Sequence, residues 1–241
     1  MAQQLEMPAS SLCVDYVDAR AVDGWRVTAA QRLDINALGQ LASRLKLTVV
    51  GIVPDASALG AFFPWLPVEE DGRLHDPVLR ENFVERVFAL HELNVMRKNG
   101  LTRRALLDFH SRYKLQLLAH YQAGYREIGP FVASLHEWDD LDAFFVAYRD
   151  KLMNILKKPA SRKNHTNVLM HIQGYFRNQL NSRQRGELRD VILHYRDGLL
   201  PILAPLTLLK HYLAEYPDRY LMTQNYFDPY PDDLGLRLAV T

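Results

Sequence analysis

From residue 78 onward, apolar residues recur at the three- and four-residue spacing of amphipathic helices. Residues 101–121 show the pattern most clearly, with Leu106, Tyr113 and Leu117 on one face. Thr102 stands where a helix N-cap belongs, directly after an Asn-Gly pair that stops the preceding helix. We therefore predict a helix here. We also expect the amphipathic stretch at residues 164–177 to lie against it.

The same periodicity predicts helices along the rest of this region, and a Gly-Pro pair at 129–130 predicts a break between two of them. The expected helices are residues 78–98, 101–121, 131–138, 141–156 (capped by Asp139 or Asp140), 164–180, a helix between Ser182 and Gly198, and residues 200–216. The tail, residues 217–241, is rich in Tyr, Asp and Pro, which predicts irregular coil.

The first 61 residues follow a different pattern. Residues 12–17 alternate apolar and polar positions as a strand does, residues 33–45 suit a short amphipathic helix, and residues 47–53 are a β-branched run typical of a strand. The fold class we predict is mainly α. A multi-helix bundle of about six to seven helices follows a small α/β N-terminal segment.

The segment between these parts is rich in proline and acidic residues, which favours a linker. The predicted domains are therefore residues 1–61, a small α/β segment, residues 62–77, the linker, and residues 78–241, the helical domain. An Asp-Pro pair at 76–77 supports the start of the helical domain, because aspartate caps helices and proline suits their first position.

Charge is distributed unevenly, although the net charge is only +1. Residues 1–75 carry 6 basic and 9 acidic side chains, whereas residues 97–196 carry 18 basic and 9 acidic ones. A surplus of cations of this kind favours an anionic partner for the helical domain.

The single cysteine, Cys13, excludes an intrachain disulfide and an all-cysteine metal or iron–sulfur site in one chain. The N-terminal sequence lacks the features of a signal peptide, and no long uncharged apolar run suggests a membrane span. We therefore expect a cytoplasmic protein that is not a membrane protein.

Cationic and aromatic side chains in two of the predicted helices suit a phosphate backbone and unpaired bases. The expected nucleic-acid-binding residues are Arg103, Arg104, Arg112, Tyr113 and Lys114 in the first helix, and Arg162, Lys163, Asn167, Gln173, Tyr175 and Arg177 in or near the second. A mid-helix glycine, Gly174, predicts close approach of another helix or of a ligand.

Three histidines, His110, His165 and His171, are candidates for acid–base catalysis, although no complete catalytic motif accompanies them. No two histidines have the i, i+4 spacing of a helical metal site, and no E-x-x-H pair occurs. We expect no metal and no cofactor, and whether the protein is an enzyme stays open.

Four strings carry a family resemblance: HELNVMRKNGLTRRALLDFHSRYKLQLLAH, GPFVASLHEW, NHTNVLMHIQGYFR and LLPILAPLTLLKHYLAEYP. Over residues 78–230 the chain resembles the YbgA family of bacterial helical domains. The resemblance implies two settings. Such domains neighbour DNA photolyase, and they occur fused behind a TudS-type desulfidase, an iron–sulfur module acting on thiouracil or on tRNA thiouridine. The string FPWLPVEEDGRLHDPVLRENFVERVF resembles the junction of such a fusion.

The resemblance does not extend to the desulfidase, because that module needs several cysteines and a longer segment before the junction. We therefore expect a helical protein that binds RNA, most simply tRNA, in connection with thiolated bases or the response to photodamage. Two alternatives stay open. One is a metal-independent enzyme that uses the three histidines on a modified nucleobase or small molecule, and the other is an interaction module for a photolyase or desulfidase chain.

Overall fold

The computed structural model describes residues 12–18, 25–31 and 63–238. The chain divides into two compact units, Met1–Phe63 and Pro64–Thr241. In the first unit, β1 (Leu12–Asp18) pairs antiparallel with β2 (Trp25–Gln31). The predicted strand at residues 12–17 is confirmed and contains Cys13, whereas its partner was missed in the sequence. The predicted helix at 33–45 and strand at 47–53 lie outside the described residues.

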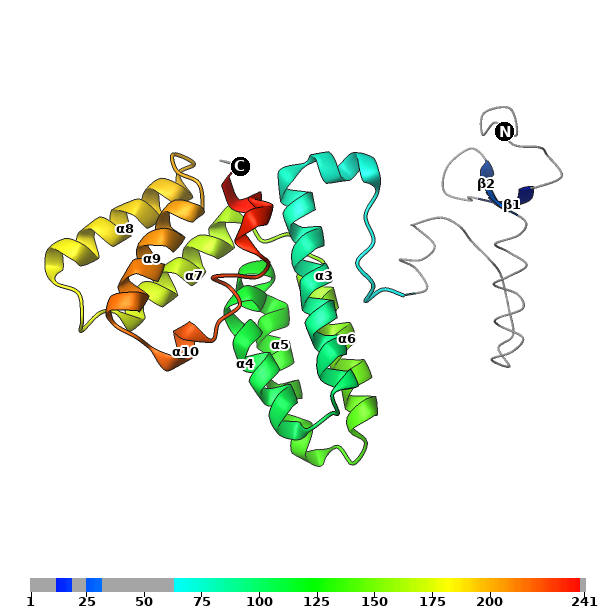
Figure 1. The fold of residues 1–241 in the computed structure, drawn as a ribbon, viewed down its shortest axis with the longest axis horizontal. Helices are drawn as coiled ribbons and strands as arrows, with labels where there is room; N and C mark the ends of the chain where they lie inside the picture. Colours follow the sequence, from blue (N-terminus) through cyan, green and yellow to red (C-terminus); the bar gives the residue numbers. More distant parts are fainter. Residues whose placement is uncertain (1–11, 19–24, 32–62, 239–241) are drawn as a thin grey trace. The chain divides into compact units, whose positions relative to one another are not determined.

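The second unit is helical, as predicted, and its elements follow one another with short connections (Figure 1). They are η2 (Asp71–His75), α3 (Pro77–Lys98), α4 (Arg103–His120), α5 (Gln122–Ala133), η3 (Ser134–Glu137), α6 (Leu141–Leu156), α7 (Arg162–Tyr175), α8 (Ser182–Arg196), α9 (Leu203–Glu215), α10 (Arg219–Met222), η4 (Asp232–Leu234) and η5 (Leu236–Leu238).

Local capping explains most helix starts. Asp76 accepts hydrogen bonds from two backbone N–H groups at the start of α3, Thr102 caps α4 and Asp140 caps α6, all as predicted. The helix expected at 200–216 begins at Leu203, and α5 begins at Gln122, where no helix start was predicted. The starts of α7 and α8 differ from the prediction by one or two residues. Ser161 caps α7, so that helix begins at Arg162, and Asn181 caps α8 through a reciprocal capping box with Gln184.

Proline 130 does not break the chain into two helices, contrary to the prediction. α5 runs through it and ends at Ala133, and the predicted helix at 131–138 is wrong, since those residues form the end of α5 and the short turn η3. The lost N–H is tolerated because the surrounding side chains pack well: Ile128 and Val132 are buried, and Phe131 stacks on Phe144 with ring centres 4.8 Å apart.

Two hydrophobic cores hold the helical unit together, and α4 contributes to both. Phe109 and Leu117 face a core formed with α3, α5 and α6, whereas Leu115 and Ala119 face a core formed with α7, α8 and α9. α7 packs against α4, which confirms the expected pairing of these two stretches. Figure 1 shows α3 to α6 as one group of helices and α7 to α9 as another.

Parts of the predicted linker belong to the helical unit. Trp65 and Leu66 pack against the first core, and the guanidinium of Arg149 lies 3.9 Å from the centre of the Trp65 ring. Buried Arg86 donates from Nη2 to the carbonyl of Leu66 at 3.1 Å. The segment that follows Phe63 is therefore anchored on the helices by aromatic and backbone contacts.

The tail contains only short helical turns, and its last part returns to α3. Figure 1 shows this segment, in red, beside the first turns of α3, in cyan, and η5 contacts α3. The return places residues at the two ends of the helical unit next to each other, and the candidate site lies where they meet.

Candidate functional site

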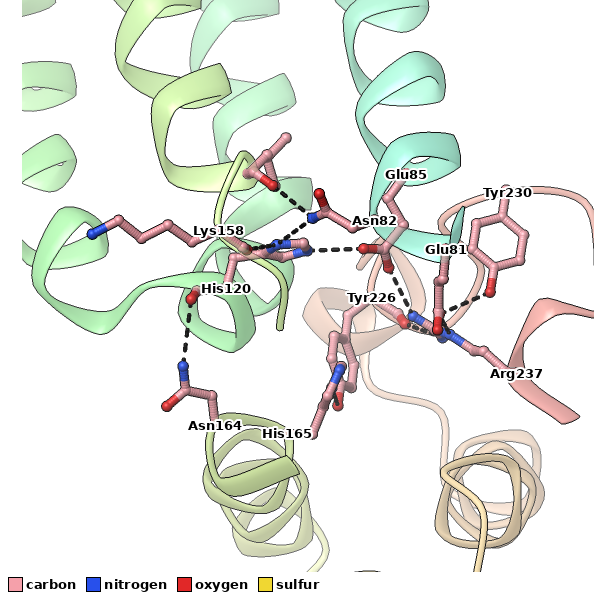
Figure 2. Close-up of polar contacts among 11 residues, drawn as sticks. Glu81, Asn82, Glu85, His120, Lys158, Asn164, His165, Tyr226, Tyr230 and Arg237 are labelled. Carbon is pink, nitrogen blue, oxygen red and sulfur yellow. Dashed lines mark hydrogen bonds and ion pairs between the residues drawn. The ribbon is translucent and has the colours of Figure 1, made fainter. Parts of the chain in front are cut away.

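Arg237 of the tail is the centre of a buried polar network (Figure 2). Its side chain is 6% exposed. Nε donates to Glu81 Oε1 at 2.8 Å, Nη2 donates to Glu85 Oε1 at 3.2 Å, and Nη1 donates to the carbonyl of Tyr226 at 2.9 Å. The guanidinium therefore joins the tail to two carboxylates of α3. We call Arg237, Glu81, Glu85, His120 and Tyr230 the Arg237 network.

Helical spacing brings the two carboxylates together. Glu81 and Glu85 are four residues apart on α3 and so lie on one face. Burial and the charge of Glu85 raise the pKa of Glu81, against the lowering effect of Arg237. The Arg237 pKa is raised: burial alone would lower it, but the two carboxylates outweigh that effect. Tyr230 also donates to Glu81 Oε1 at 2.8 Å, so the anion is compensated from two sides.

His120, the last residue of α4, supplies the second cation. Its Nε2 lies 2.9 Å from Glu85 Oε2, and both side chains are almost fully buried. Its Nδ1 lies 2.7 Å from the carbonyl of Lys158, which can only accept, so Nδ1 carries a proton. Burial alone would lower the His120 pKa and raise the Glu85 pKa, but their attraction outweighs burial in both cases. Their attraction therefore favours the charged form of both groups.

Amide side chains tie the network to the ends of three helices. Asn82 of α3 donates to the carbonyl of Leu156, at the end of α6, at 2.8 Å. Asn164 of α7 donates to the carbonyl of His120 at 3.4 Å. The ends of α4 and α6 and the start of α7 are thus held at one place, around a buried group of charges.

His165 of α7 lies beside this network but is neutral. Its Nδ1 lies 2.9 Å from the hydroxyl of Tyr226. Burial, with the nearby charge of Arg237, lowers the His165 pKa to about 3. In the neutral ring, Nδ1 accepts a hydrogen bond from the Tyr226 hydroxyl, and the ring proton is on Nε2.

A cavity of about 290 Å³ opens next to these groups. Residues from the start, the middle and the end of the helical unit line it: Pro77, Val78, Glu81, Ala160, Ser161, Arg162, His165, Tyr195, Pro201, Ile202, Leu236 and Arg237. Arg162 donates to the backbone carbonyl of Tyr195, and its guanidinium lies 4.8 Å from the centre of the Tyr195 ring. The walls therefore combine two arginines and one carboxylate with apolar and aromatic surface.

A second cavity, of about 390 Å³, lies between α9 and the tail and shares Leu236 and Arg237 with the first. Lys210, which lines it, forms an ion pair with Asp228. Its cation is therefore compensated within the tail, whereas the lysines that are near Ala160 and Arg162 of the first cavity in the sequence form no ion pair with a described residue.

Those lysines precede and follow Ala160. Lys157 and Lys158 stand before α7, and Arg162 and Lys163 open it. We call these four residues the basic junction. Lys157, Lys158 and Lys163 are exposed, and Arg162 is half-buried at the cavity.

Several of the residues predicted to bind nucleic acid take part in the packing of the helical unit. Arg112 forms an ion pair with Glu92 of α3, and Tyr113 donates to Glu92 Oε2 at 2.7 Å. Asn225 of the tail donates to the same oxygen at 3.0 Å. Tyr113 is 2% exposed and stacks on Phe109 with ring centres 4.4 Å apart. It therefore has no free face for a base in this structure.

The three candidate catalytic histidines have different surroundings. His110 is buried on α4, with Nδ1 3.2 Å from the hydroxyl of Tyr148. Burial, and then the charge of Lys114, lowers the His110 pKa to about 4. His171 is exposed, with its ring against Tyr175. Of the three, only His165 lines the cavity described above.

The remaining predicted residues lie along α4 and α7, outside the cavity. Arg103 donates to the carbonyl of Trp138, Arg104 pairs with Asp108, and Gln173 donates to the carbonyl of Arg185. Tyr175 stacks on Tyr220, Lys114 is half-buried, and Asn167 and Arg177 are exposed. Gly174 has open space around it, so the predicted close approach of a helix is wrong.

The central residues of the Arg237 network were missed in the sequence. Glu81 and Glu85 are at helical spacing, which indicates a shared face but not a partner. Arg237 lies 152 positions from Glu85, in a tail without periodicity. In the described part of the chain, no group of three or more His, Cys, Asp or Glu side chains could hold a metal ion. No helix within the described ranges is long and apolar enough to cross a membrane.

Comparisons with known proteins identify the family. A family model described as "Protein of unknown function (DUF1722)" matches residues 114–231. The chain is 52% identical over 152 residues to the "Uncharacterized protein YbgA" of Escherichia coli strain K12, covering 63% of this chain and 90% of that protein. It is also 45% identical over 67 residues to the "DNA utilization protein HofM" of the same strain, covering 28% of this chain and 26% of that protein.

No solved structure matches the chain. The match to YbgA extends over nearly all of that protein at an identity far above what unrelated chains share. It agrees with the resemblance of the four sequence strings. The chain therefore belongs to the YbgA family.

Proposed function

We propose that this protein binds structured RNA, with tRNA as the simplest case, through the basic junction. The observation that carries the proposal is a set of three exposed lysines that flank Ala160, Ser161 and Arg162 in the sequence, and those three residues line the cavity together with Arg237. Cations that follow one another along a surface neutralise successive phosphates and release their counterions. Unpaired loops of RNA can also enter a cavity, which a continuous duplex cannot do.

The lysines of the basic junction are available for such a partner. Among the residues that the structure describes, neither Lys157 nor Lys163 has an ion-pair partner. The amine of Lys158 lies 3.2 Å from the centre of the Tyr121 ring, an interaction that leaves the positive charge uncompensated. The three charges therefore add to the positive potential at this surface.

The start of α7 contributes in the same direction. Ser161 accepts a hydrogen bond from the N–H of Asn164, while the N–H groups of Arg162 and Lys163 have no partner among the described residues. Free N–H groups at a helix start, together with the helix dipole, favour a phosphate. The basic junction thus combines side-chain and backbone donors.

The cationic face predicted on α4 is a weaker candidate. Arg112 is paired with Glu92, Arg104 with Asp108, and Arg103 donates to a backbone carbonyl. A phosphate gains less binding free energy from these arginines, because each arginine would first lose the contact that it already makes. We therefore centre the proposed interface on the start of α7 and not on the middle of α4.

The test is binding of tRNA by the full chain across a salt series, for the wild type and two triple variants. Lys157→Ala/Lys158→Ala/Lys163→Ala removes the exposed lysines of the basic junction. Arg183→Ala/Arg189→Ala/Arg196→Ala removes the same charge from α8, where each arginine has an acidic neighbour. Duplex DNA of similar length serves as the second ligand, since one similar protein is named for DNA use.

We expect the lysine variant to bind tRNA more weakly and to reduce the slope of log affinity against log salt by about 2, since each phosphate contact contributes roughly 0.7–0.9. The α8 variant should keep the wild-type slope. No binding at low salt, or equal losses in both variants, would overturn the proposal. The enzyme and the interaction module stay predictions.

A further inference from the structure

The cavity beside the basic junction carries hydrogen-bonding groups that the fold itself does not use. Oε1 of Glu81 accepts from Arg237 and Tyr230, whereas Oε2 has no hydrogen-bond partner among the described residues. His165 uses Nδ1 for the Tyr226 hydroxyl, which leaves its Nε2–H as a donor without a described partner. Both residues line the same cavity. It therefore offers one acceptor and one donor to a ligand.

The rest of the lining suits a flat, largely apolar ring. Val78, Pro201 and Ile202 contribute apolar surface, and Tyr195 contributes an aromatic one. The volume of about 290 Å³ is just below the range of small-molecule sites, about 300–1,000 Å³. A single base fits this description better than a dinucleotide does.

The Arg162 guanidinium, which also lines the cavity, is a further group that a ligand can meet. Arg162 uses Nη1 for the carbonyl of Tyr195, and no described residue pairs with the rest of its guanidinium. Arg237, by contrast, is committed to Glu81 and Glu85. Arg162 can therefore meet a phosphate outside the cavity without disturbing the Arg237 network.

We propose that this cavity receives one unpaired nucleobase of the RNA held on the basic junction. Glu81 accepts a hydrogen bond from a ring N–H or amino group of the base, and His165 donates to a neighbouring ring nitrogen or carbonyl oxygen. Bases in loops are free to turn out and present such an edge, with a donor and an acceptor side by side. This inference rests on the proposed function and adds the part of the RNA that is recognised.

The test fills the cavity without touching its charges. Val78→Trp introduces a large side chain at a residue of α3 that lines the cavity, and Val87→Trp introduces the same side chain on α3 at a residue that does not. Both valines are exposed to a similar degree, 36% and 40%. Neither variant should change the fold, which circular dichroism and thermal unfolding verify.

Each protein is titrated with a stem–loop RNA and with a series of the same RNA in which one loop nucleotide at a time is abasic. For the wild type and Val87→Trp, one abasic position should weaken binding by about tenfold or more, the loss expected for one stacked base. Val78→Trp should bind intact RNA about as weakly as the wild type binds that abasic RNA, with an unchanged salt slope.

Two results would overturn the inference. One is equal affinity of the Val78→Trp and Val87→Trp variants for the intact RNA, and the other is a wild type that tolerates abasic substitution at every loop position. Either of these leaves the salt dependence and the lysine variant to decide the proposed function separately. Absence of RNA binding by the wild type overturns both proposals together.

Discussion

The Arg237 network and the basic junction each contribute an arginine to the first cavity, Arg237 and Arg162, but the cations of the two groups differ in their partners. In the network every cation has an anion, and the groups are buried: Arg237 meets Glu81 and Glu85, and His120 meets Glu85. At the basic junction the lysines are exposed and no described carboxylate pairs with Lys157 or Lys163. The first arrangement holds the fold together, and the second is open to a partner.

The difference follows from the cost of burying charge. A buried cation requires a hydrogen-bonded anion, because its hydration is lost. An exposed cation keeps its hydration and gains little from a single ion pair. Charge that contributes to stability is therefore found where the tail meets α3, and charge that can serve binding is found where the chain enters α7.

The largest effect on this comparison should come from Arg237→Ala. The substitution leaves the partly buried Glu81 without its cation, leaves the buried Glu85 with His120 alone, and releases the tail from α3. We expect a loss of about 3–5 kcal/mol in the free energy of unfolding, the range for breaking a buried ion pair. Urea denaturation measures it. Arg196→Ala is the control, since Arg196 is exposed and pairs only with Asp197. A loss below 1 kcal/mol for Arg237→Ala would contradict the role given to the network.

The buried histidines should give the next largest effect on the free energy of unfolding. The pKa of His120 is raised, whereas that of His110 is lowered. The pKa of His110 is lowered from 6.5 to about 4. Below pH 6.5 the unfolded chain therefore binds a proton at this residue that the folded chain does not, and stability falls as the pH decreases. Between pH 6.5 and pH 5 the contribution is on the order of 2 kcal/mol.

His110→Gln should remove that part of the acid slope in urea denaturation measured between pH 5 and pH 8. Part of the slope should stay, because His165 is also neutral, with a pKa of about 3. The raised pKa of His120 has the opposite pH dependence. Protonated His120 stabilises the fold fully below pH 6.5, and this stabilisation is lost as the pH rises through the pKa of His120 in the folded chain. A variant with the full wild-type acid slope would show that His110 is protonated in the folded chain.

The smallest effect on stability should come from the basic junction. Lys157→Ala/Lys158→Ala/Lys163→Ala should change the free energy of unfolding by less than about 0.5 kcal/mol per residue, as is usual at exposed positions.

Arg112→Ala should have the opposite pair of effects. It should lower the free energy of unfolding by about 1 kcal/mol and leave the salt slope of RNA binding unchanged. If Arg112→Ala flattens that slope, the interface lies on α4 as well.

The residues show why some features could be predicted from the sequence and others could not. Asp76, Thr102 and Asp140 were predicted as caps because a cap hydrogen bond spans only two or three residues. The contact of α7 with α4 was expected for two amphipathic stretches, and the structure confirms it. Arg237 carries no such local signal, since its partners on α3 are more than 150 residues away.

At the candidate site, too, some residues could be predicted from the sequence and others could not. Arg162, Lys163 and His165 were predicted as functional residues from their residue types, and the structure places them at or beside one cavity. Arg112 and Tyr113 were predicted on equal grounds, yet both contact Glu92. A basic or aromatic residue on an amphipathic helix suits packing and binding alike, and only its neighbours distinguish the two.

The sequence by itself determined the helical class, the family, most helix ends and the surplus of positive charge in the second part of the chain. These properties depend on local periodicity, on capping and on composition, which are present in any stretch of the chain. Only the tertiary structure decided which charges are paired, because pairing depends on contacts between distant segments. It placed Arg237 against Glu85, left the lysines of the basic junction exposed, and formed the cavity that Glu81, Arg162 and Arg237 line.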